Sequence, residues 1–392
     1  MMTLMDYSNQ IEALEQQYGL SFYPQEFEFV NQSDMIGYMT YAGFINHYPH
    51  WSFGKLFDRL KSTKTSFEVV INNNPCIAYL LKTNSQLTQI LIIAHVFAHN
   101  DFFKNNVFFT ENQGPKDAIT MFKYHSQRIR EYIREFGEAA VEDILTAAHS
   151  IKSYCAQGSL LDFIAQNTTG WQSDIIQIVA QQNRYFQPQI ETKIINEGWA
   201  SFWHYKILNE LNLPADKYFE FISLHNTVIS PTKGTLNPYY IGFKIWTDIY
   251  EKNDIAKMLA VREFNNDSSF IRNYLTEKLC AEMNLFSYTN KDAVSTVKTS
   301  SNEFTKIQTT LINHIGKNSV PEMEIVEYNN NMFTILHIFD GRELDLLYTT
   351  ETLKHIQSLL KREITLITDF SGITRKIICD NQNKIYVQNF TS

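Results

Sequence analysis

The sequence predicts a mainly α large domain with a candidate metal site on its helices, followed by a small C-terminal α+β domain. Two observations lead to this fold class. Up to residue 288, apolar residues recur at the three- and four-residue spacing of amphipathic helices. After a stretch rich in Ser, Thr, Asn and Lys, the chain changes to short β-rich runs. We therefore expect a helical domain over 1–288, a linker with a bridging helix over 289–318, and an α+β domain over 319–392.

Most of the first domain is predicted as consecutive helices separated by short turns. Gly137 is expected to break one long helical pattern into two, and residues 72–75 have the composition of a turn. Asp34 is a candidate N-cap of the second helix. Two extended segments, 27–30 and 67–71, interrupt the helical pattern. The expected helices cover residues 6–18, 35–39, 56–60, 88–97, 117–136, 138–154, 159–166, 172–184, 195–208, 217–225, 239–250 and 267–285.

The last part of the chain has a different pattern. A helix over 304–315 is expected to bridge the two domains. Beyond it, short β-rich runs predict four strands around one helix. The expected strands cover residues 322–328, 332–339, 363–368 and 376–379, and the helix covers 349–360. No catalytic cluster is recognisable in this predicted α+β domain.

Composition and motifs argue against several functional classes. Among 392 residues the formal net charge is -8 and no Lys/Arg stripe occurs, which argues against nucleic acid as the partner. No Walker A, GxGxxG or GxSxG motif is present, which removes the commonest nucleotide-binding and serine-hydrolase interpretations. The 4 cysteines are widely separated and form no CxxC pair, so we expect free thiols rather than disulfides.

The sequence predicts a cytoplasmic protein without a transmembrane segment. Residues 1–17 lack the charged and then apolar layout of a signal peptide. The longest apolar run, 90–98, is too short to cross a bilayer and contains His95. Export as an effector by a route that needs no signal peptide stays open at this point.

Two stretches carry the residues of a candidate metal site. His95 and His99 lie one helical turn apart, so both imidazoles can face one ion. This spacing alone is weak support, because buried histidines that bond to carbonyl groups are common. Glu197 is a carboxylate among the apolar residues of a second predicted helix, so it either satisfies a neighbouring imidazole or helps to hold an ion.

The sequence Asn-Glu-Gly-Trp-Ala at residues 196–200 resembles the segment that supplies the third ligand in zinc peptidases of the gluzincin type. The resemblance implies zinc as the cofactor and Glu197 as the ligand from a later helix, so we expect His95, His99 and Glu197 to bind the metal together. Those peptidases have a glutamate directly after the first histidine as general base, whereas this chain has Val96. The candidates to replace that base are Asp101, His204 and His225.

His204 leaves three interpretations open. It could polarise a substrate carbonyl or act as an acid or base, as could His225. As a fourth ligand it would instead close the metal site and make it structural. Bonded to Glu197, it would be an ordinary core histidine. Asn237 and Tyr239, at the junction of a loop and a helix, are expected to contact the substrate.

The remaining histidines of the helical domain are less informative. His47 and His50 flank a Tyr-Pro pair and are expected to shape a turn. His125 lies on a charged helix and is expected to be solvated. For His149, which follows two alanines, structural and functional roles are equally open.

Longer motifs run through the chain. They lie at residues 50–55, 70–72, 74–80, 93–95, 99–100, 102–106, 185–186, 188–189, 196–200, 202–204, 225, 237–239, 242–243 and 269–272. Together they resemble the SpoVR-like family, which is named for a stage V sporulation protein. The resemblance covers nearly the whole chain, and it implies a link to spore cortex formation and to a serine kinase of the PrkA type. Typical members are longer, so the resemblance implies a shortened and diverged member.

Three functional hypotheses follow. The leading one is a zinc-dependent hydrolase of amide or peptide bonds that acts on peptidoglycan or its cytoplasmic precursors. The second is a non-catalytic scaffold that docks a PrkA-like kinase or a cell-wall enzyme, which the valine at position 96 favours. The third is an effector that degrades cell wall after delivery. The ligand count separates the first two, since three protein ligands favour catalysis and four favour structure.

Overall fold

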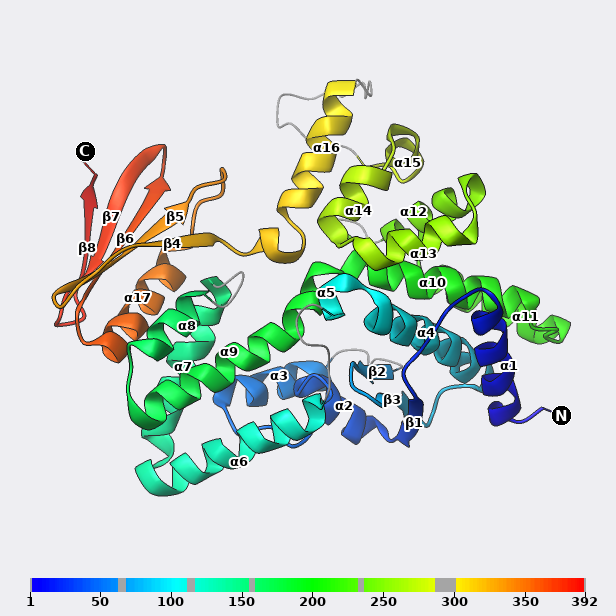
Figure 1. Cartoon of the computed structure of the whole chain (residues 1–392), viewed down its shortest axis with the longest axis horizontal. Coiled ribbons are helices and arrows are strands. Elements are labelled where there is room, and N and C mark those ends of the chain that lie inside the picture. Colours follow the sequence, from blue (N-terminus) through cyan, green and yellow to red (C-terminus); the bar gives the residue numbers. More distant parts are fainter. Residues whose placement is uncertain are drawn as a thin grey trace. The chain divides into compact units, whose positions relative to one another are not determined.

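The computed structural model describes residues 2–62, 68–110, 117–154, 159–231, 236–285 and 301–390. Within these ranges the chain is mainly helical, and a five-stranded sheet lies near the C-terminus (Figure 1). The predicted fold class, a mainly α body with a small C-terminal α+β domain, is therefore confirmed. The expected linker over 289–318 is only partly described, because its residues up to 300 lie outside these ranges.

The chain forms two compact units that alternate along the sequence. The first consists of Met1–Ile45, Ser52–Thr120 and Pro188–Gly316, and the second of Asn46–Trp51, Met121–Gln187 and Lys317–Ser392. Residues 121–187 thus group with the C-terminal sheet, because helices from this segment pack on the helix of that sheet. The domain boundaries predicted from composition stay a prediction.

The first unit contains most of the helices and a small sheet. Its strands are β1 (Gln25–Val30), β2 (Glu68–Ile71) and β3 (Cys76–Leu81), in the order β1-β3-β2, with β1 parallel and β2 antiparallel to β3. Its helices are α1 (Leu4–Gln17), α2 (Gln32–Thr40), α3 (Trp51–Lys61), α4 (Gln86–Asn105), α5 (Val107–Thr110), α10 (Lys193–Glu210), α11 (Ala215–Val228), α12 (Pro238–Lys252), α13 (Ile255–Phe264), α14 (Asp267–Tyr274), α15 (Glu277–Glu282) and α16 (Ser301–Asn313).

Strand β3, which the sequence analysis does not predict, forms the centre of the small sheet. All of its residues are buried, and they form one continuous apolar run. Such a run is typical of a strand covered on both faces, but it lacks the alternation that marks a strand in sequence. The two predicted extended segments correspond to β1 and β2. Strand β2 begins with Glu68, which pairs with Leu80 of β3.

Helices α4 and α10 lie side by side at the centre of the first unit (Figure 1). Both are buried on nearly all sides, as expected of helices that are apolar around their whole circumference. Ser85 begins α4, because its hydroxyl accepts a hydrogen bond from Thr88 N at 3.1 Å. The helix continues to Asn105, past the predicted end at residue 97, so His99 lies inside it.

The start of α10 is held by a carboxylate from another helix. Thr192, the N-cap residue, makes no side-chain capping hydrogen bond. Instead, Asp267 of α14 accepts hydrogen bonds from Ile194 N at 3.0 Å and from Ile195 N at 2.9 Å. A carboxylate there satisfies two otherwise unpaired N–H groups and suits the positive end of the helix dipole. The backbone just before Glu197 is therefore fixed.

Helices α10 and α12 touch through their backbones at two glycines. A methyl group on Gly198 would stand 2.3 Å from Gly242 Cα, and one on Gly242 would stand 2.2 Å from the carbonyl oxygen of Ile194. The two helices can approach this closely because glycine has no Cβ atom. Trp246 of α12 adds a hydrogen bond from its Nε1 to the carbonyl oxygen of Ile195 at 2.9 Å.

Two predicted helix boundaries are wrong. Helix α2 is capped by Asn31, whose side chain accepts from the backbone N of Asp34 at 2.9 Å, so Asp34 lies in the first turn rather than at the cap. The predicted helix over 267–285 is two helices, α14 and α15. Thr276 starts the second one by accepting a hydrogen bond from Leu279 N at 3.2 Å. In both cases a neighbouring polar side chain captures the free backbone N–H groups.

The second unit combines helices with the C-terminal sheet. Its helical segments are most of α6 (Ala118–Phe136) and α9 (Gly170–Glu191), together with α7 (Glu138–Ile151), η1 (Lys152–Tyr154), α8 (Ser159–Gln166) and α17 (Leu346–Leu360); the 3-10 turn η2 (Gly316–Ser319) leads into it. Gly137, at a φ of 87°, separates α6 from α7 as predicted. Its strands are β4 (Glu322–Tyr328), β5 (Met332–Ile338), β6 (Glu363–Phe370), β7 (Ile373–Cys379) and β8 (Ile385–Asn389).

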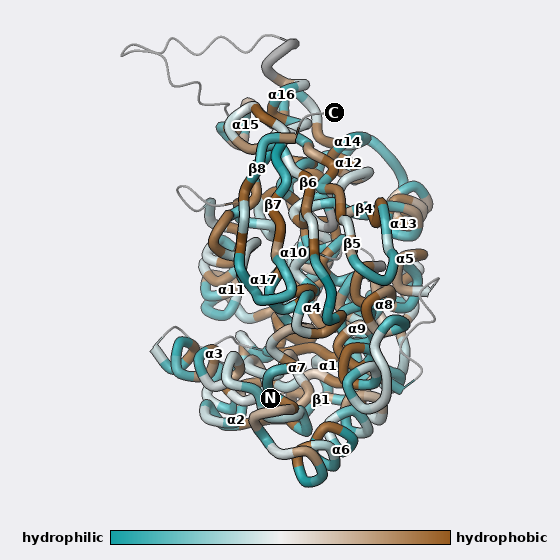
Figure 2. The backbone as a smooth tube through the Cα atoms, turned by 90° about the vertical axis from the view of Figure 1, so that its left-hand side faces the viewer, coloured by the Kyte–Doolittle hydropathy of each residue, from teal (hydrophilic) through white to brown (hydrophobic). Residues whose placement is uncertain are grey.

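The five strands follow in the order β4-β5-β6-β7-β8, and β8 is a strand that the sequence analysis does not predict. Only the β5–β6 pair is parallel, and α17 forms the crossover between its two strands. Hydrophobic and hydrophilic segments mix along these strands (Figure 2). Such mixing is typical of a sheet that is covered on one face.

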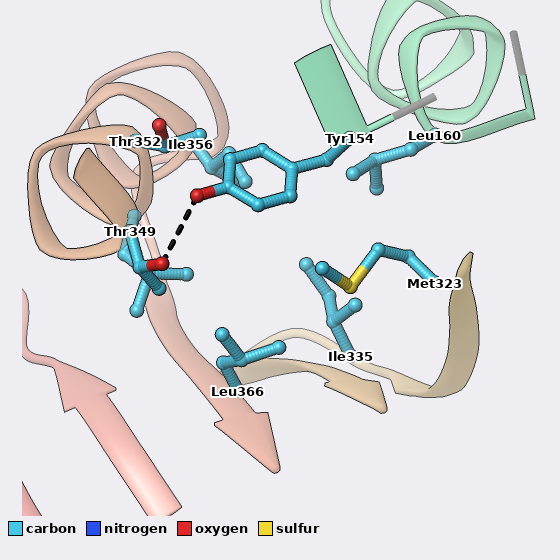
Figure 3. A pocket seen from close by; sticks show the side chains of 9 residues that line it. Tyr154, Leu160, Met323, Ile335, Thr349, Thr352, Ile356 and Leu366 are labelled. Carbon is cyan, nitrogen blue, oxygen red and sulfur yellow. Dashed lines mark hydrogen bonds between the residues drawn. The ribbon is translucent and has the colours of Figure 1, made fainter. Parts of the chain in front are cut away.

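A small cavity of about 20 Å³ lies between this sheet and its helices (Figure 3). Met323, Ile335 and Leu366 of the strands line it. From the helices, Tyr154 lines it with its ring while its hydroxyl bonds to Thr349 Oγ1 at 3.0 Å. Because the lining is apolar and the volume suits about one water molecule, we expect this space to be dry.

Candidate metal centre

Helices α4 and α10 bring together the three residues that the sequence predicts as metal ligands. The Nε2 atoms of His95 and His99 lie 3.0 Å apart. Glu197 Oε2 lies 3.6 Å from Nε2 of His95 and 3.4 Å from Nε2 of His99. Both histidines are buried, and Glu197 Oε2 is buried without a hydrogen-bond partner among the described residues. Three ligand atoms thus converge on one point.

The spacing of these atoms suits a tetrahedral ion. With zinc–nitrogen and zinc–oxygen bonds of about 2.0–2.1 Å, tetrahedral ligand atoms lie roughly 3.3–3.4 Å apart. The three distances, 3.0, 3.4 and 3.6 Å, bracket that value. Two imidazole nitrogens that face each other at 3.0 Å need either a proton on one of them, which then forms a hydrogen bond, or a metal ion that both can bind. The donor set therefore fits zinc.

Charge within the centre favours an anionic glutamate. Burial alone would raise the pKa of Glu197, but the imidazoles of His95 and His99 outweigh it and hold the pKa well below the usual range. Burial likewise would lower the pKa of His99, but Glu197 and Asn196 outweigh it and raise the pKa. The pKa of His95 is lowered, by burial and by its neighbour His99. Glu197 is thus ionised and ready to bind a metal ion, and such an ion must displace the proton that the raised pKa favours on His99.

His204 and His225 lie behind His95, on the side away from the ligand atoms. His204 Nδ1 lies 3.0 Å from Nδ1 of His95, and His204 Nε2 lies 2.8 Å from Nδ1 of His225. Because both ring nitrogens of His204 face other imidazoles, neither is available to a metal ion as a fourth ligand. Its hydrogen-bond partners are also histidines rather than Glu197. The catalytic roles predicted for His204 and His225 stay predictions.

Asp101 is not brought to the imidazole pair. Its carboxylate accepts hydrogen bonds from Ser21 N at 2.9 Å and from Trp199 Nε1 at 3.1 Å, and it lies 3.5 Å from Arg262 Nε. Burial raises its pKa to about 6, against the opposing effect of Arg262. These contacts join the segment between α1 and β1 to α10 and α13 through Asp101, and its role as the substitute base stays a prediction.

The two predicted substrate contacts differ in their surroundings. Asn237 caps α12, since its Oδ1 accepts from Tyr239 N at 3.0 Å while its Nδ2 donates to the carbonyl oxygen of Val228 at 3.1 Å. Tyr239 instead reaches the metal centre, where its ring stacks on His95 with centroids 6.0 Å apart. The charge of Glu197, followed by burial, raises the pKa of Tyr239 well above its ordinary value. The Tyr239 phenol therefore stays protonated and can donate a hydrogen bond.

Two further residues belong to the centre and are missed by the sequence analysis. Asn196 Oδ1 lies 2.9 Å from Nδ1 of His99, so the imidazole donates there and turns Nε2 toward Glu197. Glu68, at the start of β2, is coupled by charge to Glu197, His99 and Tyr239. Asn196 could have been predicted from the sequence, because it stands next to Glu197 in the Asn-Glu-Gly-Trp-Ala segment. Glu68 carries no such signal, because a small sheet brings it to the site.

Comparison with known proteins places the chain in a family. A family model described as "SpoVR like protein" matches residues 1–159 and 154–320, which include every residue of the candidate centre. The chain belongs to the SpoVR family. It is 28% identical to the "Uncharacterized protein YcgB" of Escherichia coli (strain K12), in an alignment that covers 73% of this chain and 74% of that protein. No solved structure matches the chain.

In the described ranges of this SpoVR-family chain, no helix has both the length and the apolar character needed to cross a membrane.

A second group of histidines occurs in the second unit. His50 Nε2 lies 3.1 Å from Thr146 Oγ1, and His149 Nε2 lies 3.0 Å from the hydroxyl of Tyr48. His125 is buried and bonds to Gln181 Oε1 at 2.9 Å, so its prediction as a solvated residue is wrong. Lys123 and Arg130 of the same helix are exposed instead. Among the described residues, this group offers no convergent set of three metal ligands.

These histidines predict acid lability. Burial lowers the pKa of His50, His125 and His149, and it lowers the pKa of His47 to about 4. Below pH 6.5 the unfolded chain therefore binds protons that the folded chain does not. The free energy of unfolding is expected to fall as pH drops from about 6.5 to about 4, by on the order of 3 kcal/mol for His47 alone. In chemical denaturation at several pH values, His47→Gln should fall less steeply than the wild type. Parallel curves for the two proteins would refute this origin.

Proposed function

We propose that this SpoVR-family chain is a zinc-dependent hydrolase of amide or peptide bonds, with peptidoglycan or its cytoplasmic precursors as the substrate class. One observation carries the proposal. His95, His99 and Glu197 present three ligand atoms at tetrahedral spacing, and no fourth protein ligand completes the set among the described residues. Three protein ligands leave one position open for a substrate or water, which is the pattern of catalytic rather than structural zinc sites.

The residues around the open position suit hydrolysis of an amide. A zinc ion would supply Lewis-acid polarisation of the scissile carbonyl group. Tyr239, which stays protonated beside Glu197, would donate a hydrogen bond to the oxygen on which negative charge develops. Asn196 keeps the His99 ring in the orientation that the ligand set needs. Cytoplasmic action and a role in sporulation or cell-wall metabolism form part of the same proposal.

Glu68 is our candidate for the base that Val96 cannot provide. Burial and the charge of Glu197 raise the pKa of Glu68 to about 7, while His99 opposes them, so this carboxylate can take up a proton near neutral pH. Glu68→Gln is expected to lower kcat by about 100-fold or more while zinc content stays at the wild-type level. Glu28→Gln, an exposed carboxylate on β1 of the same sheet, is the control. An unchanged kcat for Glu68→Gln would exclude this role.

The test of the proposed function begins with the wild-type protein. Elemental analysis after purification should find one zinc per chain, and muramyl peptides or their precursors should be cleaved at an amide bond. A chelator should abolish cleavage, and added zinc should restore it. Mass spectrometry of the products identifies the bond. A protein that holds no metal and cleaves none of these substrates would refute the proposal.

The second candidate function is a non-catalytic scaffold that docks a PrkA-like kinase or a cell-wall enzyme. The specific observation in its favour is Val96, which is fully buried in the core at the position where the peptidases carry their base. The measurements above separate the two functions. Stoichiometric zinc without hydrolysis, together with capture of a kinase or cell-wall enzyme by the wild type, would favour the scaffold.

A further inference from the structure

Three buried imidazoles form a continuous chain that starts at the metal centre. His95 of α4 meets His204 of α10 through their Nδ1 atoms at 3.0 Å, and His204 Nε2 meets His225 Nδ1 of α11 at 2.8 Å. Their exposed fractions are 4%, 0% and 2%. Each pair can share only one proton, so the tautomer of one ring determines the tautomer of the next.

The direction of this chain follows from the metal centre. If Nε2 of His95 binds a metal ion, the proton of this neutral ring must be on Nδ1, which then donates to His204 Nδ1. His204 must in turn carry its proton on Nε2 and donate to His225 Nδ1. All three rings stay neutral in this arrangement. Burial accordingly lowers the pKa of His204 and of His225, which favours the neutral forms.

The aromatic neighbours of His225 hold its ring, the last of the three imidazoles, in place. Its ring packs against Tyr205 with centroids 4.6 Å apart and against Phe243 with centroids 4.9 Å apart. Aromatic neighbours on these sides restrict the ring without offering a competing charge. The second nitrogen of the other candidate ligand, His99, bonds to one side chain only, that of Asn196. The two histidine ligands are therefore oriented differently, His95 by two further histidines in series and His99 by a single asparagine.

We propose that His204 and His225 are positioning residues that orient His95 toward the metal ion and fix its tautomer. This inference rests on the proposed metal site, and it gives the two histidines a role other than direct contact with the substrate. Partners that bond to the second nitrogen of a ligand histidine typically change metal affinity by about 10- to 100-fold when they are removed. The carbonyl group of Ala200 also lies near the His95 ring, so we expect a partial loss rather than a complete one.

The test measures metal affinity rather than activity. Binding of Co²⁺ and Zn²⁺ to the full-length, metal-stripped protein is followed by calorimetry and, for Co²⁺, by visible absorption. His204→Leu removes the acceptor for His95 and should weaken binding by roughly 10- to 100-fold while one ion still binds. His204→Asn can keep an acceptor near the position of Nδ1 and should recover most of the affinity. Its Co²⁺ spectrum should resemble that of the wild type.

His225→Phe and His125→Leu complete the series. His225→Phe fits the aromatic surroundings and should weaken binding by up to about 10-fold, because His204 loses the acceptor that fixes its tautomer. His125→Leu removes a buried imidazole that is not part of the His95–His204–His225 series, and it should leave the metal affinity unchanged. If circular dichroism shows that His204→Leu does not fold, the metal affinities of His204→Asn and His225→Phe test the proposal. In that case a wild-type affinity for His225→Phe overturns the proposal.

The outcomes distinguish this inference from the function on which it rests. If the wild type binds no metal, the proposed function fails and the orienting role fails with it. If the wild type binds one ion and folded His204→Leu binds it equally well, only the orienting role is overturned.

Discussion

Glu197→Gln is expected to abolish stoichiometric zinc binding and to reduce hydrolysis to background. The carboxylate supplies one of the three ligand atoms and the only negative charge among them. Its Oε2 atom is buried and has no hydrogen-bond partner among the described residues, so a bound ion would account for its burial. A neutral amide of the same shape keeps the volume but is a far poorer zinc ligand. Elemental analysis and the rate of amide cleavage measure the two effects.

The same substitution should remove the stabilisation that zinc gives to the fold. A ligand present at 1,000 times its Kd stabilises the folded state by about 4 kcal/mol, provided that it binds only the folded chain. Zinc should therefore raise the Tm of the wild type but leave the Tm of Glu197→Gln unchanged. Glu210→Gln, near the end of the same helix, is the matched control and should behave like the wild type. One zinc per chain in Glu197→Gln would show that the ligand set is wrong.

Gly198→Ala is expected to destabilise the first unit by about 3 kcal/mol or more, although it adds only one methyl group. The new carbon would stand 2.3 Å from Gly242 Cα, and a backbone atom cannot rotate away as a side-chain end can. Helix α12 must therefore shift from α10, and Tyr239 at its start moves with it. Glu197 is the adjacent residue, so we expect weaker zinc binding as well.

Gly37→Ala provides the matched control for this prediction. Gly37 also lies in a helix, α2, but a methyl group there meets nothing within 4 Å. Because alanine favours helix over glycine, this variant should be stabilised by about 0.5–1 kcal/mol. Urea denaturation of the two variants measures both changes. Equal stabilities for Gly198→Ala and the wild type would show that the two helices can separate at no cost.

Several features could be predicted from the sequence because they depend on local spacing. Two histidines four residues apart must share a helix face, whatever the fold, so His95 and His99 were identified without the structure. Gly137 similarly marks a break between two helices, because it can adopt a φ of 87° at little cost. The longer motifs indicated the family, and the match over residues 1–320 confirms it.

Other features depended on which elements pack together. Asp101 follows His99 by two residues and therefore lies on another face of α4, where Trp199 and Arg262 engage it. Glu68 is distant in sequence, yet strand pairing in a small sheet brings its charge to Glu197. The chain of His95, His204 and His225 likewise requires three helices to pack.

The sequence by itself thus determined the mainly helical fold class, the family and the residues from which a metal site would be built. Only the tertiary structure decided which side chains each of these residues contacts. It turned both nitrogens of His204 toward other imidazoles, gave Asp101 structural partners and brought Glu68 to the centre. The physical reason is that helical periodicity fixes which side chains share a face, whereas burial and packing between distant segments fix what that face meets.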